Sequence, residues 1–446
     1  MTSNESFIKE EKMEEIKNVK GTHDVFGDEN NAYEKVESLM KSIAEIYAYK
    51  GVRPPVLEYN SVFVRGVGES SDVVRKEMYT FADKGGRDLT LRPEFTAGIM
   101  RLVVQNKLYA TSELPLKLYY VGPVFRYERP QLGRYRQFNQ FGVESIGHNS
   151  PMNDVEVIVL AYTILSSLGL ENVKIKINTL GDEASRNAYR TALKEYFAKY
   201  IDNMCVDCKS RFELNPLRIL DCKVPEDRPV IDGAPKIGAY LSKESKERFD
   251  AVLEALESLQ IPYEIDQGLV RGLDYYSETV FEFHYKSNKG NDYGAIGAGG
   301  HYGSLMKELG GPDLPGVGFS FGIERIVSVL QDNELLNDVA YELDAYIMPL
   351  DKSLDLYAQE VAVILRNSGG YKVDICFDNV KLGNMFKRAT NKNAKYAVII
   401  GEDEAKAESV VLKDLATQEQ TTVKIENLID KLDELYESSY PEEEEK

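Results

Sequence analysis

The run Val124-Phe125-Arg126-Tyr127-Glu128-Arg129-Pro130 ends a strand-like stretch, and the polar loop Gln131-Leu132-Gly133-Arg134-Tyr135-Arg136 follows it directly. A second alternating stretch, residues 138–144, begins just after the loop. Two strand-like segments joined by a short glycine-containing loop are typical of a β-hairpin, in which the strands are antiparallel. The tip of this hairpin concentrates four arginines. Guanidinium groups bind phosphates bidentately, so the hairpin by itself is compatible with a triphosphate site and equally with a solvated tip.

Further strand-like segments lie on both sides of the hairpin. We expect strands at residues 54–57, 88–91, 116–121, 263–265, 278–285, 293–298 and 316–322. Apolar residues at helical spacing predict a long helix from Asn31 that ends before Gly51, a second over residues 151–168, and a third from Ile323. Residues 183–260 are charged and helix-rich and separate two strand-rich blocks. We therefore interpret them as an insertion within one domain.

The pattern changes again after about Asn333. Strands and helices alternate at residues 344–349, 354–367, 372–377, 382–390 and 396–400, and two more strands, 409–412 and 420–425, precede a helix through Leu435. Such alternation predicts a compact α/β domain. The expected organisation is a polar extension (1–18), a strand-rich domain (19–335), an α/β domain (342–436) and an acidic tail (437–446) that we expect to be disordered.

The composition places the chain among ordinary globular proteins. Its 446 residues are enough for two or three domains, and the 43% apolar and 28% charged fractions are near average. No apolar stretch approaches the roughly 20 residues that span a bilayer. The first 20 residues are too acidic for a signal or transit peptide, so we expect a cytoplasmic enzyme. The net charge of −19 argues against bulk electrostatic binding of nucleic acid, although a local basic groove stays possible.

The four cysteines do not predict a disulfide scaffold. Cys205 and Cys208 have a metal-type spacing, and Cys222 follows them. Structural zinc usually takes four ligands as two pairs, and here the second pair has one member. We favour ordinary reduced thiols and predict no metal site, with zinc as the alternative.

Arginines in two other segments strengthen the phosphate hypothesis. Arg271 precedes Gly272, where the backbone can approach a ligand closely, and Arg325 follows a glycine-rich strand and opens a helix. Polar residues of another kind occur in two further segments. Glu94 and Thr96 lie in one, and Gln140 and Glu144 lie on the outgoing hairpin strand. Their carboxylates and amide could hold an amino group or an imidazole.

These segments together resemble the histidyl-tRNA synthetases, a family of class II aminoacyl-tRNA synthetases. The similar segments are the opening motif at 20–24, the second class motif at 125–128 and 142–144, the third at 318–325, and two segments peculiar to histidine enzymes at 269–276 and 297–300. The resemblance runs from about Lys20 to Leu435. It implies an α+β fold: an antiparallel-sheet class II catalytic domain with a helical insertion, plus a C-terminal α/β anticodon-binding domain. It also implies a homodimer, formed through the first long helix.

The resemblance implies a reaction and a role for each candidate residue. L-Histidine and ATP, with Mg²⁺, would form histidyl adenylate, and tRNA(His) would then accept the histidyl group. Arg126 and Arg271 would act on the α-phosphate as the catalytic residues, and Arg134 and Arg325 would hold the outer phosphates. The implied histidine-binding residues are Glu94, Thr96, Arg126, Gln140, Glu144, Arg271, Tyr275 and Tyr276. From residue type alone, one of the two tyrosines is expected to be a core aromatic.

One loop departs from the family pattern. The family usually has arginine, tyrosine and aspartate after the paired glycines, whereas this chain has His301, Tyr302 and Gly303. The family's residues either brace the loop or orient the tyrosine in the pocket. The first case predicts a modest effect on activity and the second predicts weaker histidine binding.

Three other functions are alternatives to a histidine enzyme. A non-catalytic histidine-sensing regulatory relative lacks the C-terminal domain and tends to lose the catalytic arginines. A tRNA sensor would belong to a much longer chain with a kinase, and the Arg271 segment disfavours a synthetase for another amino acid. In the C-terminal domain, Lys381, Lys387, Arg388 and Lys392 would form one face of a helix, either as a tRNA phosphate contact or as a solvated face.

Overall fold

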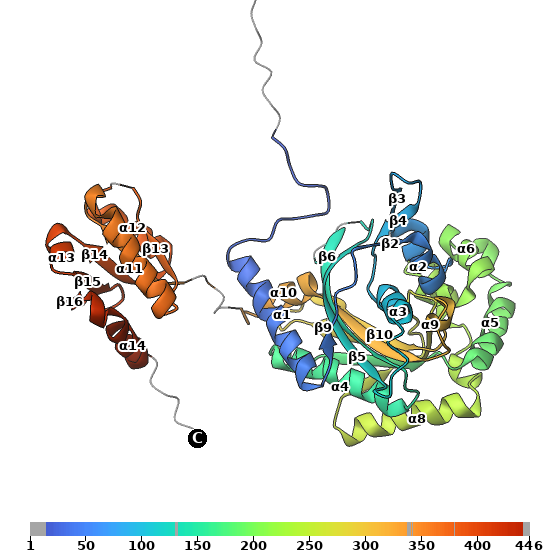
Figure 1. Ribbon diagram of the computed structural model, residues 1–446. Coiled ribbons are helices and arrows are strands. Elements are labelled where there is room, and N and C mark those ends of the chain that lie inside the picture. The colour runs from blue at the N-terminus through green and yellow to red at the C-terminus, as the bar shows by residue number, and fades with distance from the viewer. Residues whose placement is uncertain (1–14, 130–132, 337–339, 341, 379, 440–446) are drawn as a thin grey trace, which may run out of the picture. The chain divides into compact units, whose positions relative to one another are not determined.

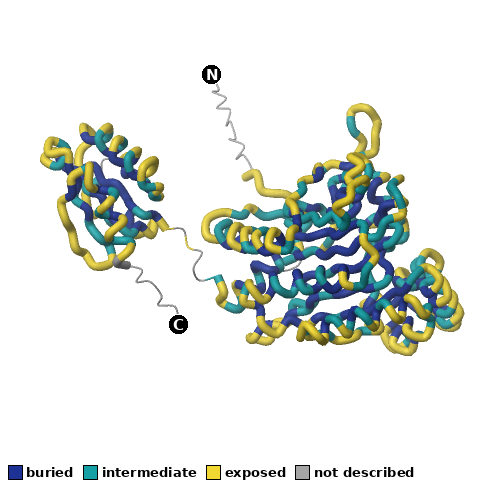
Figure 2. The backbone as a smooth tube through the Cα atoms, turned by 60° about the horizontal axis from the view of Figure 1, so that its bottom comes forward, coloured by how far each residue is buried: buried dark blue, intermediate teal, exposed yellow. Residues whose placement is uncertain are grey.

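The computed structural model describes residues 15–129, 133–336, 340, 342–378 and 380–439. The chain divides into two compact units, residues 1–337 and 338–446. In each unit the strands are mostly buried and the helices expose one side (Figure 2). No helix in the described ranges is long and apolar enough to cross a membrane. Most of the predicted polar extension (1–14) and acidic tail (440–446) lies outside the described residues.

An eight-stranded sheet forms the centre of the first unit (Figure 1). Its order is β1 (Lys50–Gly51), β5 (Leu116–Phe125), β6 (Gln137–Ile146), β11 (Gly316–Gly322), β10 (Asp292–Tyr302), β9 (Tyr276–Lys286), β7 (Lys174–Thr179) and β8 (Tyr263–Ile265). The two outermost pairs, β1 with β5 and β7 with β8, are parallel, and the pairs between them are antiparallel. The predicted hairpin is confirmed as β5 and β6, and the antiparallel α+β fold is confirmed with it.

Helices lie on both sides of this sheet. On one side α1 (Asp28–Ile46) contacts both α4 (Pro151–Ser167) and α10 (Ile323–Asp332). On the other side α2 (Asn60–Val67), α3 (Thr96–Gln105) and the short α9 (Leu305–Glu308) pack together (Figure 1). A small sheet of β2 (Leu57–Tyr59), β4 (Asp88–Leu91) and β3 (Tyr79–Ala82) lies next to α2. The apolar core between the sheet and α2, α3 and α9 therefore surrounds the start of α3.

The predicted insertion contains helices and no strand among its described residues. It comprises α5 (Glu183–Phe197), α6 (Val206–Leu214), α7 (Arg228–Asp232), α8 (Lys243–Ser258) and short 3₁₀ turns, around an apolar cluster of its own. The flanking strands β7 and β8 are parallel neighbours at the sheet edge. The chain therefore leaves the sheet and returns to it at adjacent positions, which explains how a large insertion is tolerated within one domain.

Several predicted elements differ from the structure. The strand predicted at 54–57 is wrong except for Leu57, because Pro54 and Pro55 cannot donate a backbone hydrogen bond to a sheet. Strand β7 was not predicted, although Ile175 and Ile177 alternate with lysines. The first helix ends at Ile46, earlier than the position of Gly51 suggested, and Gly51 belongs to β1.

The second unit is an α/β fold. Its sheet has the order β13 (Val373–Ile375), β12 (Leu343–Pro349), β14 (Ala394–Ile400), β15 (Ser409–Asp414) and β16 (Gln420–Lys424). The first three strands are parallel and the last two pairs are antiparallel. Its helices are α11 (Asp355–Ser368), α12 (Leu382–Asn391), α13 (Glu402–Lys406) and α14 (Leu428–Ser439). Because α14 continues to Ser439, the assignment of residues 437–439 to a disordered tail was wrong.

Candidate active site

Two neighbouring cavities open over the central sheet, and they share a wall that includes Arg126, Gln140 and Arg271. The first has a volume of about 330 Å³ and the second about 540 Å³. Nine of the ten predicted site residues line the first cavity: Glu94, Thr96, Arg126, Arg134, Gln140, Glu144, Arg271, Tyr275 and Tyr276. The tenth, Arg325, lines the second cavity. The fold thus brings together residues that the sequence places more than 200 positions apart.

Glu144 lies in the wall of the first cavity and is fully buried. Its carboxylate accepts hydrogen bonds from Thr96 Oγ1 at 2.7 Å, Tyr302 Oη at 2.7 Å and Tyr120 Oη at 3.4 Å. Burial raises the pKa of Glu144 to about 8, because a low-polarity environment disfavours the charged form. Gly318 faces Glu144 on the neighbouring strand, and a Cβ at that position would overlap the carboxylate. This glycine is therefore required for Glu144 to occupy its place.

Glu94 lies at the start of α3, close to Thr96. Its two carboxylate oxygens accept hydrogen bonds from the backbone N–H groups of Thr96 (2.6 Å) and Ala97 (3.0 Å). The positive end of a helix stabilises a carboxylate, but burial is the larger effect and raises the pKa of Glu94. Glu94 and Glu144 thus place two buried carboxyl groups in one cavity, a suitable environment for a cationic amino group.

Tyr275 and Tyr276 are both buried and both line the first cavity. Their ring centroids are 4.5 Å apart, and Tyr275 packs edge-on against Tyr302 at 5.7 Å. Both also belong to the apolar core around α3. Residue type alone predicted one core aromatic, whereas both tyrosines belong to the core and both also line the cavity.

Arg126 and Arg134 lie on either side of Glu128 at the base of the hairpin loop. Arg126 donates from Nε to the carbonyl of Pro93 at 2.8 Å, and its guanidinium lies 5.6 Å from the centroid of the Phe138 ring. Glu128 is 4.0 Å from Arg126 and 3.9 Å from Arg134, at the limit of an ion pair. Both arginines line the two cavities, and neither forms a close ion pair with Glu128.

Arg325 lies at the start of α10, beside the second cavity. It donates to the carbonyl of Ala295 at 2.7 Å, and its buried Nε has no partner among the described residues. Burial lowers its pKa, and the nearby cation Arg134 lowers it further. Two guanidinium groups that repel each other across a cavity form a favourable site for a polyanion. The adjacent Glu324 accepts from the backbone N–H of Asn139 at 2.8 Å and so ties α10 to the hairpin.

Arg271 lies where the two cavities meet. It forms an ion pair with Glu282 of β9, and its guanidinium is 5.6 Å from the centroid of the Tyr276 ring. Its Nε is buried without a hydrogen-bond partner in the described part of the chain. Arg218, from the insertion, donates to the carbonyl of Arg271 at 3.1 Å. Glu282 therefore holds the guanidinium, Arg218 holds the backbone of Arg271, and the guanidinium still has an unused Nε donor.

Three contact residues of the site were not predicted from the sequence. Tyr120 contacts Glu144, Glu282 pairs with the Arg271 side chain, and Arg218 donates to the Arg271 backbone. Tyr120 and Glu282 lie inside predicted strands, where alternation with apolar neighbours could have marked them as residues of one face. Arg218 belongs to the insertion, and no local signal connects it to the site.

His301 is buried and lines neither cavity. Its Nδ1 is 3.1 Å from Asp154 of α4, and Arg248 of α8 pairs with the same Asp154 at 2.8 Å. Tyr302, the next residue, still reaches Glu144. These contacts favour the bracing interpretation of this departure from the family pattern, because the charged partner of Asp154 is supplied here by Arg248.

In the second unit, the predicted basic face of α12 is partly neutralised. Arg388 pairs with Asp378 and Lys392 pairs with Asp374, both at 2.6 Å. Lys381 and Lys387 are exposed. A contact with tRNA phosphates through this face stays a prediction.

Comparison with known proteins assigns both units. The family model "Histidyl-tRNA synthetase" matches residues 21–326, and the model "Anticodon binding domain" matches residues 344–435. The histidine–tRNA ligase of Bacillus subtilis is 44% identical over 410 residues, covering 92% of this chain and 96% of that protein. Histidine–tRNA ligase 1 of Shouchella clausii is 45% identical over 418 residues, covering 93% and 97%.

Solved structures give the same assignment. The crystal structure of apo histidyl-tRNA synthetase from S. aureus superposes with a TM-score of 0.80 at 35% identity, covering 94% of this chain and 100% of that one. The resemblance noted in the sequence is therefore confirmed over nearly the whole length. The chain belongs to the histidyl-tRNA synthetase family.

Proposed function

We propose that this chain is a histidine–tRNA ligase that forms histidyl adenylate from L-histidine and ATP and then transfers the histidyl group to tRNA(His). The main observation behind the proposal is the wall that the two cavities share, which includes Arg126 and Arg271. On one side of it lies a pocket lined by buried carboxyl groups and tyrosines, and on the other lies a second cavity lined by arginines. Family membership and 44% identity to a histidine–tRNA ligase over 92% of the chain support it.

Histidine would occupy the first cavity. Its α-ammonium group would lie near Glu94 and Thr96, and its imidazole would contact Glu144, Tyr275 and Tyr276. Buried polar groups lose their hydrogen-bond partners when an amino acid with the wrong side chain binds. This penalty can lower kcat/KM for the wrong amino acid by roughly 10⁴-fold. The hydrogen bonds from Thr96 and Tyr302 would orient the carboxyl group of Glu144 for such discrimination.

ATP would occupy the second cavity, with Arg134 and Arg325 on its outer phosphates and Arg126 and Arg271 on the α-phosphate. The histidine carboxylate attacks the α-phosphorus, and pyrophosphate leaves. Negative charge on the phosphoryl oxygens is stabilised by guanidinium groups whose positions are set before the reaction. The chain's own part is positioning and fixed positive charge, and no side-chain nucleophile is needed.

Mg²⁺ would accompany ATP and neutralise part of its phosphate charge. The carboxylates of Glu77 and Glu128 line the first cavity near the arginines. Burial raises the pKa of Glu77, and the negative charge of Glu128 raises it further. Two adjacent carboxylates are suitable oxygen ligands for a hard cation, and we propose them as candidate Mg²⁺ contacts.

In the second step the terminal ribose hydroxyl of tRNA(His) takes the histidyl group and AMP leaves. We propose that the second unit recognises the anticodon, since residues 344–435 match an anticodon-binding model. We also propose a homodimer, with α1 at its interface, and a cytoplasmic location. Size-exclusion chromatography with light scattering would measure the dimer directly.

ATP–pyrophosphate exchange with a panel of amino acids tests the proposal. Exchange that depends on histidine alone is the expected result. The regulatory alternative predicts histidine binding without exchange. Retention of Arg126, Arg271 and Arg325, together with the C-terminal unit, favours the enzyme over that regulator.

A further inference from the structure

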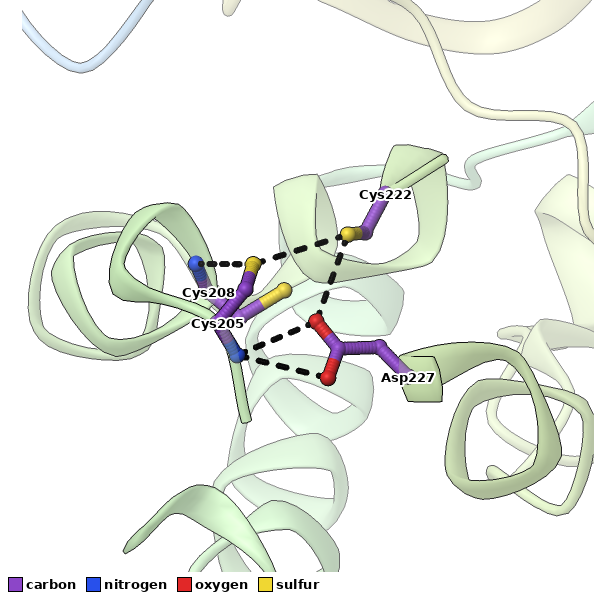
Figure 3. A group of neighbouring side chains, drawn as sticks. All are labelled: Cys205, Cys208, Cys222 and Asp227. Carbon is purple, nitrogen blue, oxygen red and sulfur yellow. Dashed lines mark hydrogen bonds between the residues drawn. The ribbon is translucent and has the colours of Figure 1, made fainter. Parts of the chain in front are cut away.

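The helical insertion brings four metal-ligating side chains together: Cys205, Cys208, Cys222 and Asp227 (Figure 3). Cys205 precedes α6 and Cys208 lies in its first turn. Cys222 follows the 3₁₀ turn Pro216–Asp221, and Asp227 is the last residue of the 3₁₀ turn Pro225–Asp227 that precedes α7. Their three sulfur atoms and one carboxylate point toward a common space, and one ligand atom from each lies within 4.8 Å of the others. Asp227 supplies the fourth ligand that the cysteine spacing alone lacked.

The distances in this cluster fit a tetrahedral ion. The sulfur atoms of Cys205 and Cys222 are 3.8 Å apart. A tetrahedron with metal–sulfur bonds of about 2.3 Å has sulfur–sulfur edges of about 3.8 Å. The carboxylate of Asp227 is 3.5 Å from the Cys222 sulfur, a slightly shorter edge, as expected because metal–oxygen bonds are shorter than metal–sulfur bonds.

Backbone groups orient the ligands as they would around a metal. The N–H of Cys208 donates to the Cys205 sulfur at 3.4 Å, and the N–H of Val224 donates to the Cys222 sulfur at 3.5 Å. The N–H of Cys205 donates to Asp227 Oδ2 at 3.2 Å. Such bonds fix ligand direction and stabilise negative charge on sulfur. Cys208, Cys222 and Asp227 are all at most 4% exposed, so the charge they would carry needs a cation within the cluster.

We propose that Cys205, Cys208, Cys222 and Asp227 bind one Zn²⁺ ion as a structural site. Three soft thiolates select zinc over magnesium or calcium. Four protein ligands close the coordination sphere and leave no position for substrate. On binding, the three thiols lose their protons to solvent and each sulfur donates an electron pair to the ion.

The ion would brace a segment that reaches the active site. Between Cys208 and Cys222 the chain carries Arg211 and Arg218, which both pair with Asp72, at 2.7 and 3.2 Å. Arg218 also donates to the backbone carbonyl of Arg271. This positioning role rests on the proposed ligase function, whereas metal binding itself does not.

Metal analysis of the purified full-length chain, kept reduced, tests the site. We expect about one zinc ion per chain, measured by inductively coupled plasma mass spectrometry after gel filtration. Cys376→Ser is the matched control, because Cys376 is also buried but belongs to the second unit and is not one of the four clustered residues. It should keep the zinc, whereas Cys222→Ser and Asp227→Asn should lose it or release it faster to a chelator.

Cobalt substitution keeps the test decisive where a cysteine variant fails to fold. Apo protein with added Co²⁺ should show thiolate-to-cobalt charge transfer in the near ultraviolet and the strong visible bands of a tetrahedral ion. Absence of both zinc and these bands in a folded parent chain would overturn the proposal. Formation of a Cys205–Cys222 disulfide in a chain that binds no metal would overturn it too. If the chain binds metal but pyrophosphate exchange is unchanged after the metal is removed, the metal site stands and only its proposed effect on Arg271 is refuted.

Discussion

Replacing Arg271 with alanine tests the centre of the proposed mechanism. The guanidinium lies at the junction of the two cavities and is paired with Glu282. In the proposed reaction it stabilises charge that develops on the α-phosphate. Removal of one prearranged donor from such a site costs about 2.7–4 kcal/mol of transition-state stabilisation, or about 10²–10³-fold in rate.

The same substitution should have a smaller effect on folding. Arg271 and Glu282 are each 17% exposed, so the ion pair is only partly desolvated. Glu282 also keeps His284 at 2.9 Å after Arg271 is lost. We therefore expect Arg271→Ala to lower the free energy of unfolding by only about 1–2 kcal/mol. A folded but inactive enzyme is the predicted outcome.

Steady-state ATP–pyrophosphate exchange, with kcat and KM for histidine measured separately, is the assay. An interaction made only in the transition state lowers kcat and leaves KM for histidine nearly unchanged. Glu282→Gln is the control, since it removes the partner of Arg271 and keeps the guanidinium, and it should retain most activity. If Arg271→Ala folds and exchanges pyrophosphate within about threefold of the parent, Arg271 does not act on the phosphate.

Three further predictions concern other parts of the chain. Burial raises the pKa of Glu144 from 4.5 to about 8, so its contribution to stability is complete below pH 4.5 and is lost as the pH rises through 8. Glu144→Gln should reduce the pH dependence of the free energy of unfolding, measured by chemical denaturation, by up to about 1.4 kcal/mol per pH unit. An unchanged slope of stability against pH would contradict the raised pKa of Glu144. Asp154→Asn should destabilise the chain by about 3–5 kcal/mol in the same assay, since it leaves Arg248 and His301 without their shared partner, and a loss below about 1 kcal/mol would mean that the cluster is not a brace. Deletion of residues 338–446, a separate compact unit, should abolish tRNA charging and keep part of the pyrophosphate exchange; equal loss of both would refute separate roles.

Much of the fold was predictable because its signals are local. Alternating or helically spaced apolar residues identified both strands of the hairpin, the third-motif strand and helix, and most of the second unit, since burial of one face depends on neighbours a few positions away. The arginines were predictable for a similar reason, because each stands beside a glycine or at a strand end. Errors arose where local signals were weak, as at the prolines before β2 and the short strand β7.

The sequence by itself therefore determined the family, most of the order of the elements and ten residues that line the cavities. Only the tertiary structure decided which side chains share a partner. Glu144 is joined to Thr96 from 48 positions away and to Tyr302 from 158 positions away, and Asp227 completes a set of ligands that the cysteine spacing left one short. Periodicity reports which face of an element is buried. It carries no information about which distant face packs against it, and that pairing sets the charge and chemistry of the site.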